Sequence, residues 1–193
     1  MSTYVLIVFV HIASAVLLLG TSVLGEPAVR AAARRATHPQ ELSAYLQIGH
    51  PMAALSLVSA LVLLASGIYL SSVGNVWSTG WVQVAVAFWL VNGLLAALVV
   101  RPAIRRVSEE ADGTSTPFVD RRLDDLRWSR GWTRGVDIMA ANDAAMLYLM
   151  SVKPTLGGSL AIVLLANLVV AVGRQIMGVQ QPVPADAASA SES

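Results

Sequence analysis

Residues 4–25 read YVLIVFVHIASAVLLLGTSVLG and contain no aspartate, glutamate, lysine or arginine. A helix rises about 1.5 Å per residue, so roughly 20 apolar residues cross the roughly 30 Å hydrocarbon core of a bilayer. The block is longer than the apolar part of a signal peptide, no basic residues precede it, and no convincing small-x-small cleavage site follows it. We therefore expect a retained helix that crosses the membrane.

Four further apolar blocks follow, at about residues 51–70, 81–100, 136–152 and 159–177. They do not alternate apolar and polar residues, as the strands of a membrane barrel would. Of the 193 residues, 55% are hydrophobic and only 13% are charged, whereas a soluble domain needs more surface charge. The predicted fold class is all-α, a polytopic transmembrane helical bundle over residues 1–178. Residues 179–193, rich in Pro, Ala and Ser, are expected to form a disordered cytoplasmic tail.

The composition also excludes several classes of site. The chain has no cysteine, which rules out disulfides, thiolate zinc sites, iron–sulfur clusters and covalently attached c-type haem. Walker, Gly-x-Ser-x-Gly and HExxH motifs are absent from the sequence, so the soluble chemistries that these motifs support are not expected. The arginines lie beside apolar blocks, where membrane orientation accounts for them, and nothing indicates a nucleic-acid partner.

Arginines gather in two connections between the blocks, and this bias predicts which side faces the cytoplasm. The first connection carries Arg30, Arg34 and Arg35. The third carries Arg101, Arg105, Arg106, Arg121, Arg122, Arg127, Arg130 and Arg134. Five spans with the N-terminus outside place both clusters and the C-terminus in the cytoplasm, in the cell (inner) membrane. The lipid bilayer is the expected partner, and a membrane-protein partner or a homo-oligomer stays open.

The segment at residues 117–134 combines arginine and aspartate with Leu123, Leu126, Trp128 and Trp132. We expect it to lie along the cytoplasmic interface as an amphipathic helix. Its arginines would contact anionic lipid there, or alternatively an anionic partner.

Polar residues inside membrane spans are costly, which makes them the first candidates for function. His11 lies about eight residues into the first block, on the helix face that also carries Tyr4 and Ser22. An imidazole at that depth could ligate haem iron or copper, or relay protons. The alternative is a neutral histidine hydrogen-bonded to a neighbouring helix.

The fourth block is the least hydrophobic of the five. Met139, Asp143, Met146 and Met150 fall on one helical stripe, beside a second stripe with Asn142, Leu149 and Lys153. Thioethers are soft ligands for Cu(I) or for an axial haem position, although methionine is also ordinary core filler. A carboxylate such as that of Asp143 must be protonated, paired or beside water in mid-membrane. Asp137 is closer to the cytoplasmic edge and is expected to be solvated.

Three further polar features follow from the spacing. Lys153, before Pro154, could hold a carboxylate or a propionate of a ligand, or else snorkel to the interface. Asn92 and Asn167 indicate helix packing. His38 and His50 fall on the cytoplasmic side, away from His11, so a bis-histidine haem within one chain is not expected.

Four short motifs occur in order along these blocks. They are Val10-His11-Ile12-Ala13, Ser66-Gly67-Ile68-Tyr69-Leu70, Trp81 at the start of the third block, and Met150-Ser151-Val152-Lys153-Pro154. With these motifs, roughly residues 4–154 resemble an uncharacterised family of predicted integral membrane proteins within the CopD/HemJ-like superfamily. The resemblance implies a four-helix core, to which the fifth span would be an addition.

The resemblance also implies a role for His11. In HemJ-type protoporphyrinogen oxidases the matching histidine is a haem ligand and a Val-Lys-Pro ending closes the last core helix, and CopD proteins are associated with copper uptake. HemJ proteins also carry a lysine soon after the third-helix tryptophan and a tyrosine–histidine segment after the first helix. This chain has Val82-Gln83 and Glu26-Pro27 at those places, so protoporphyrinogen oxidation is not expected.

Three functional hypotheses follow. The leading one is that haem b or a redox-linked ligand binds through His11, with Tyr4, Asn142 and Lys153 as further cofactor-binding residues. The second is copper handling by His11 together with Met146 and Met150. The third is a non-catalytic membrane subunit or scaffold of a larger complex.

Overall fold

The computed structural model describes residues 2–176, which form eight α-helices and two π-helical segments without a strand. The all-α helical bundle expected from the sequence is confirmed, and the expected disordered tail lies outside the described residues. The elements are α1 (Thr3–Leu19), η1 (Gly20–Gly25), α2 (Glu26–Arg35), α3 (Pro39–Val73), α4 (Gly80–Leu95), η2 (Ala96–Val100), α5 (Arg101–Gly113), α6 (Arg121–Arg127), α7 (Arg130–Val152) and α8 (Leu156–Ile176).

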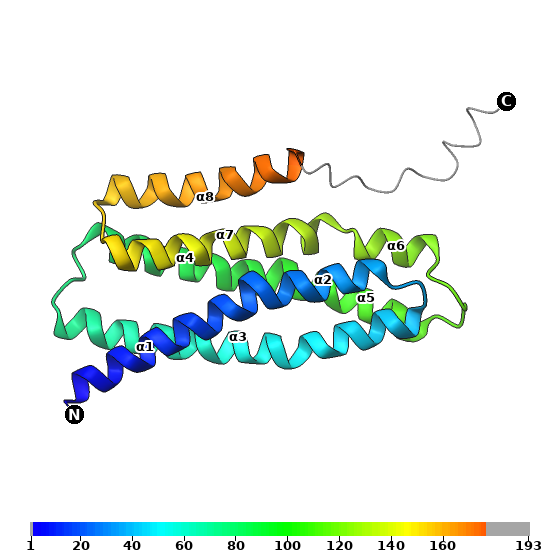
Figure 1. Cartoon of the computed structure of the whole chain (residues 1–193), viewed down its shortest axis with the longest axis horizontal. Helices are drawn as coiled ribbons and strands as arrows, with labels where there is room; N and C mark the ends of the chain where they lie inside the picture. Colours follow the sequence, from blue (N-terminus) through cyan, green and yellow to red (C-terminus); the bar gives the residue numbers. More distant parts are fainter. Residues whose placement is uncertain (1, 177–193) are drawn as a thin grey trace.

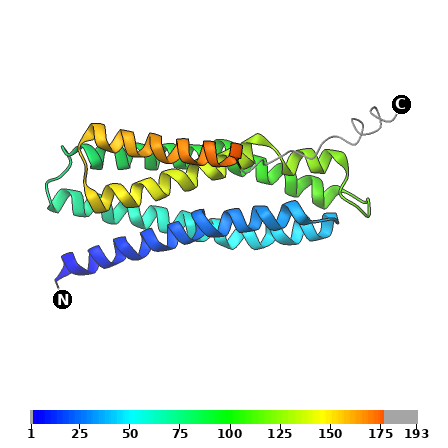
Figure 2. The ribbon, with the colours of Figure 1, turned by 45° about the horizontal axis from the view of Figure 1, so that its top comes forward.

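The helices run side by side along one long axis, and the chain reverses direction at each end of the bundle (Figure 1). The chain's N-terminus shares one end with the α3–α4 and α7–α8 connections, and we call this the N-terminal end. The α2–α3 and α5–α6 connections lie at the other, which we call the arginine-rich end. Figure 2 shows the same antiparallel arrangement from a second direction.

Four helical stretches are long and apolar enough to cross a membrane. They are Thr3–Arg35, Pro39–Val73, Gly80–Gly113 and Leu156–Ile176. The more polar α7 does not belong to this set, but it lies alongside them and buries ten residues, whereas α8 buries two. A polar helix is tolerated in a bundle when its polar side chains face other helices, and α7 has this central position.

Two prolines that look like helix breaks lie inside continuous helical stretches. The first stretch continues past Gly25 and the third past Val100, although the apolar blocks of the sequence end at those residues. In an α-helix a proline lacks the donor N–H and its ring collides with the carbonyl of residue i−4. Each proline here is the second residue after a π-helical segment, Pro27 after η1 and Pro102 after η2, and the wider π turn accommodates the missing bond.

The second long helix also begins earlier than the sequence suggested. The second apolar block begins at Pro51, but α3 starts at Pro39 and contains Pro51 in its interior. His38 precedes the helix in an extended conformation, and Pro39 takes the first-turn position where a missing N–H costs nothing.

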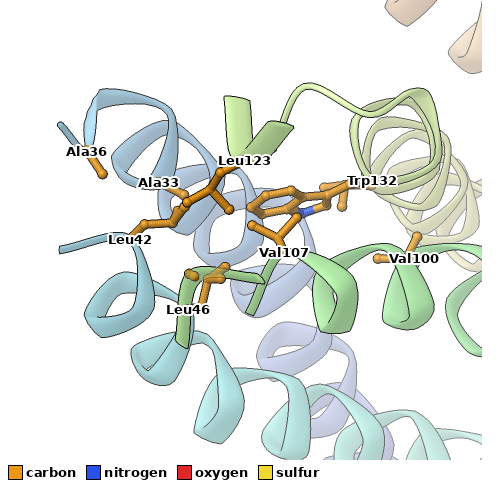
Figure 3. Close-up of a cluster of buried hydrophobic side chains, with 10 residues drawn as sticks. Ala33, Ala36, Leu42, Leu46, Val100, Val107, Leu123 and Trp132 are labelled. Carbon is orange, nitrogen blue, oxygen red and sulfur yellow. The ribbon is translucent and has the colours of Figure 1, made fainter. Parts of the chain in front are cut away.

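The segment at residues 117–134 does not form one amphipathic surface helix. Only α6 and the first turns of α7 are helical there, and Ser129 separates them in a non-helical conformation. Leu123 is fully buried and Trp132 is 2% exposed. Both pack with Ala33, Leu42 and other apolar side chains in a cluster at the arginine-rich end (Figure 3). The apolar residues of this segment therefore close the bundle against itself.

A second, smaller cluster joins α4, α7 and α8 through Val84, Ala145, Leu149 and Val163. At its N-terminal end α4 approaches the start of α8 so closely that a Cβ atom at Gly80 would come within 2.5 Å of the Leu156 backbone. A side chain larger than hydrogen would have to push α8 away, so Gly80 is required by this contact.

Candidate functional site

The His11 imidazole points from α1 to α3, where its Nδ1 lies 2.9 Å from the Ser66 hydroxyl. Two backbone carbonyls can accept the hydroxyl hydrogen, that of Val62 at 2.6 Å and that of Leu63 at 3.1 Å. When the hydroxyl donates to either of them it accepts from Nδ1, which favours the Nδ1–H tautomer with the lone pair on Nε2. A histidine that ligates a metal has this arrangement, because a bond from one nitrogen orients the other.

Gly67 makes room for the same ring. A Cβ atom at Gly67 would lie 3.2 Å from Cε1 of His11, tighter than ordinary packing. Ser66 therefore binds the imidazole and Gly67 leaves space for it. The motif around His11 and the motif that begins at Ser66 thus lie in contact.

Tyr4 does not share this environment. Although helical spacing placed it on the face of His11, it is 50% exposed on the outside of the bundle. Lys153, by contrast, contacts another motif residue: it ends α7 in a left-handed conformation, and its ammonium group lies 5.9 Å from the centre of the Trp81 ring. A cation over an aromatic face is attracted by the ring, and this contact ties α7 to α4 at the N-terminal end.

Asn142 lies in a ladder of amides that joins α4, α7 and α8. It is 1% exposed, donates to Asn92 Oδ1 at 2.7 Å and accepts from Asn167 Nδ2 at 2.8 Å. Asn92 in turn donates to Asp143 Oδ1 at 2.8 Å. The expected packing role of Asn92 and Asn167 is confirmed, and the Asn142 amide is engaged by protein on both sides.

Asp143 ends this ladder inside the bundle and is 8% exposed. Among the described residues no basic side chain forms an ion pair with it. The Ser22 hydroxyl on η1 faces the carboxylate but falls outside hydrogen-bond geometry, and it has no other partner in the part of the chain described.

A void of about 20 Å³ adjoins Asp143 between α1, α3 and α7. Met146 and Met150 line it together with Asp143, so the structure brings these three stripe residues to one place. The void is large enough for a single water molecule. It is far smaller than the roughly 300–1,000 Å³ of ordinary ligand sites, so it does not hold a porphyrin.

Asp137, six residues before Asp143, has the opposite environment, and the expectation that it is simply solvated is wrong. Arg30 Nη2 contacts its Oδ1 at 2.6 Å, and Arg174 contacts its Oδ2. Nearby, Arg34 donates to Thr133 Oγ1 at 2.8 Å and stacks over Trp128 at 4.1 Å. These arginines, taken in the sequence as orientation signals, therefore also join α2 and α8 to α7.

A larger cavity near the arginine-rich end has no counterpart in the sequence analysis. It has a volume of about 490 Å³, mainly apolar walls, and polar groups that include Glu26, His50, Arg101 and Asp112. Glu26 was overlooked because the first helix was expected to end at Gly25. The amino-acid sequence alone does not indicate that α2, α3 and α5 enclose a cavity.

The residues at His11 fit the donor chemistry of a haem or copper ligand through Nε2. Within residues 2–176 no group of three or more His, Cys, Asp or Glu side chains could hold a metal ion. Thioether ligands are not among those groups, so this observation does not test a site made by His11 with methionines.

Comparison with known proteins agrees with this architecture. A family model described as "Predicted integral membrane protein (DUF2269)" matches residues 5–154. That range ends with the Lys153-Pro154 motif and leaves α8 outside. No curated protein and no solved structure gives a significant match. The chain therefore belongs to the DUF2269 family of predicted integral membrane proteins.

Proposed function

We propose that this membrane protein binds haem b through Nε2 of His11 and takes part in one-electron redox chemistry. The observation that carries the proposal is the hydrogen bond between His11 Nδ1 and Ser66, which orients the ring and favours the tautomer with its lone pair on Nε2. In the proposed orientation the N-terminus lies outside the cell membrane, so His11 belongs to the outer half of the bundle.

The surrounding residues would support this role in distinct ways. Ser66 orients the imidazole and Gly67 leaves space for its edge. Lys153, at the same end of the bundle, offers an ammonium group that could pair with a propionate while Trp81 holds its side chain. When bound, haem b supplies reversible one-electron transfer between membrane and aqueous carriers.

An absorption spectrum tests the proposal directly. Full-length protein purified from haem-replete cells should show a Soret band, and His11→Ala should abolish it. His50→Ala is the matched control, because His50 lines the cavity near the arginine-rich end, and it should leave the band unchanged. Ser66→Ala should keep the haem but change its spectrum or potential. A colourless, folded wild-type protein would contradict haem binding.

A copper site is the second candidate, because Met146 and Met150 line one void a helical turn from His11. Soft thioethers together with one imidazole favour Cu(I). Metal analysis of the purified protein should then find copper that is lost in Met146→Leu/Met150→Leu. If neither haem nor copper is found and His11→Ala leaves the phenotype intact, the hypothesis of a non-catalytic subunit is favoured instead.

A further inference from the structure

We propose that Glu26 and Asp143 form a proton-exchange path that leads from the cavity near the arginine-rich end to the middle of the bundle. The path does not require a cofactor at His11 and is therefore independent of the proposed function. It rests on the placement of two carboxylates and one unpartnered hydroxyl.

Asp143 has the surroundings of a carboxyl group that carries a proton. Asn92 on α4 donates one hydrogen bond to it, Ser22 on η1 faces it, and Leu63 on α3 lines the void beside it. Within residues 2–176 no neighbouring side chain is a cation that would balance a full negative charge. Because an uncompensated charge is costly in a bundle interior, the neutral, protonated form is favoured there.

Ser22 is the second observation. Its side chain is 1% exposed, and its hydroxyl, which faces the Asp143 carboxyl group, has no hydrogen bond of ordinary geometry among the described residues. Buried polar atoms in folded proteins almost always have a partner, so we expect this hydroxyl to bond to Asp143 or to a water molecule beside it. A hydroxyl can accept one proton while it donates another, which suits it to connect two carboxyl groups.

Glu26 lies four residues after Ser22 in the same helical stretch and lines the cavity of about 490 Å³. It interacts electrostatically with Asp143 on α7, with Arg101 on α5 and with Arg30 on its own helix. Within the described part of the chain it forms no hydrogen bond or ion pair. Glu26 thus stands between the buried aspartate and the space that opens near the arginine-rich end.

The other charged groups around this cavity are already engaged or lie farther along it. Glu109 pairs with Arg105, and Asp112 accepts a hydrogen bond from Ser43 at 2.7 Å. His50 lines the wall contributed by α3. Among the cavity's carboxylates, Glu26 is therefore the one that combines lack of a fixed partner with electrostatic contact to Asp143.

The local backbone favours the same location. The π-helical segments η1 and η2 both pack against α7, one carrying Ser22 and the other leading to Arg101. Such segments widen a helix and leave carbonyl groups less completely bonded, and they occur frequently at functional sites. Here η1 contains Ser22 and is followed by Glu26, and η2 is followed by Arg101, so that all three residues lie in or next to a segment that packs against α7.

The transfer can be written as a balanced step. Protonated Asp143 gives its proton through a water molecule or the Ser22 hydroxyl to the Glu26 carboxylate, so that Asp143 becomes the carboxylate and Glu26 the acid. Glu26 exchanges this proton for another with water in the cavity and returns it to Asp143 by the same route, so that both groups end in their starting states. Two interacting carboxylates disfavour simultaneous ionisation, so they share protons as a coupled pair.

Infrared spectroscopy of the full-length protein in lipid films can test this path. In the wild type we expect a carboxylic-acid C=O band that shifts when buffer in D₂O replaces buffer in H₂O. Labelling all aspartates with ¹³C should displace this band in unmutated protein, and Asp143→Asn should remove it. The label keeps the test valid even if the variant folds poorly.

Glu26→Gln should keep the Asp143 band but slow its exchange with D₂O by at least about tenfold, as loss of an acid–base group does. Ser22→Ala should slow it less. Glu109→Gln, which changes a paired carboxylate at the same cavity, should exchange at the wild-type rate. Equal exchange rates in Glu26→Gln and wild type would overturn the path. A band that disappears on adding Na⁺ at constant pH would overturn it too, because Asp143 would then bind a cation.

Discussion

Two aspartates on α7 lie six residues apart and have opposite surroundings. Asp137 contacts Arg30 from α2 and Arg174 from α8, and both of its oxygens are engaged by cations. Asp143 has an amide from Asn92 and a nearby hydroxyl from Ser22 but no cation among the described residues. The carboxylate of Asp137 therefore has cationic partners, whereas the carboxyl group of Asp143 has only neutral ones among the described residues.

This difference separates a structural layer from a candidate functional one. A carboxylate between two guanidinium groups stays ionised and holds three helices in one geometry. A carboxyl group among amides can be neutral or charged, and its state depends on what reaches it. We therefore expect substitutions around Asp137 to change stability, and substitutions around Asp143 to change function with little change in stability.

The largest effect is expected for Asp137→Asn, which leaves Arg30 and Arg174 partly buried without their counter-charge. Removing one partner of a buried ion pair costs about 3–5 kcal/mol. Thermal or denaturant unfolding of the purified protein in detergent micelles would measure this loss. Glu109→Gln is the control, since its exposed pair with Arg105 should contribute little. A loss for Asp137→Asn as small as that of the control would contradict the structural role.

A smaller loss is expected for Asn142→Ala, which removes two interhelical hydrogen bonds in the layer of Asp143. Such bonds in membrane bundles contribute about 0.6 kcal/mol each, so we expect about 1–2 kcal/mol with the volume lost. The same unfolding assay applies. If this loss matched that of Asp137→Asn, the asparagine ladder would contribute as much to the free energy of unfolding as the ion pairs do.

Arg34→Lys should destabilise by about 1 kcal/mol, because lysine cannot both stack on Trp128 and reach Thr133 with a planar fork. The change retains the positive charge and therefore separates geometry from charge. Quenching of tryptophan fluorescence provides a local readout beside unfolding. An unchanged protein would show that Arg34 serves only the charge balance at the arginine-rich end.

The smallest effect on stability is expected for Asp143→Asn, less than about 1 kcal/mol, because asparagine has nearly the shape of the protonated acid and its substitution breaks no ion pair. The asparagine keeps the oxygen that accepts from Asn92. Measuring the unfolding free energies of Asp143→Asn and Asp137→Asn side by side then tests directly whether the two aspartates differ in their contribution to stability. Strong destabilisation by Asp143→Asn would mean that its ionised form is needed for folding.

Several parts of the site could be anticipated from the sequence. His11 and Asp143 stand out because a polar side chain within an apolar block must have a partner or a function. The role of Asn92 and Asn167 in helix packing was also expected from the sequence, but not the hydrogen bonds that join both to Asn142. The partner of each could not be identified, because Ser66 is 55 residues from His11 and serines are common in membrane helices.

Other features were missed for identifiable reasons. The first and third apolar blocks were expected to end at residues 25 and 100, but both helical stretches continue past Pro27 and Pro102. A proline is unfavourable in an α-helix, and the sequence gives no sign of the π-helical turns that precede these two. Trp132 was assigned to a membrane interface, where tryptophan is common, but it is buried in a cluster of side chains from several helices. Sequence-based rules give the average environment of a residue type, whereas the position of one residue depends on the helices that pack against it.

By itself the sequence determined that the chain forms apolar helices, about where they lie, and that it carries polar groups that a bilayer cannot satisfy. These properties depend on runs of neighbouring residues and on the cost of transferring each one into hydrocarbon. Only the tertiary structure decided that Asp137 has two cations and Asp143 has none, and that Glu26 lines a cavity. Those outcomes depend on which helix faces meet, and contacts such as that between Arg30 and Asp137, 107 residues apart, arise only when the packed helices bring them together.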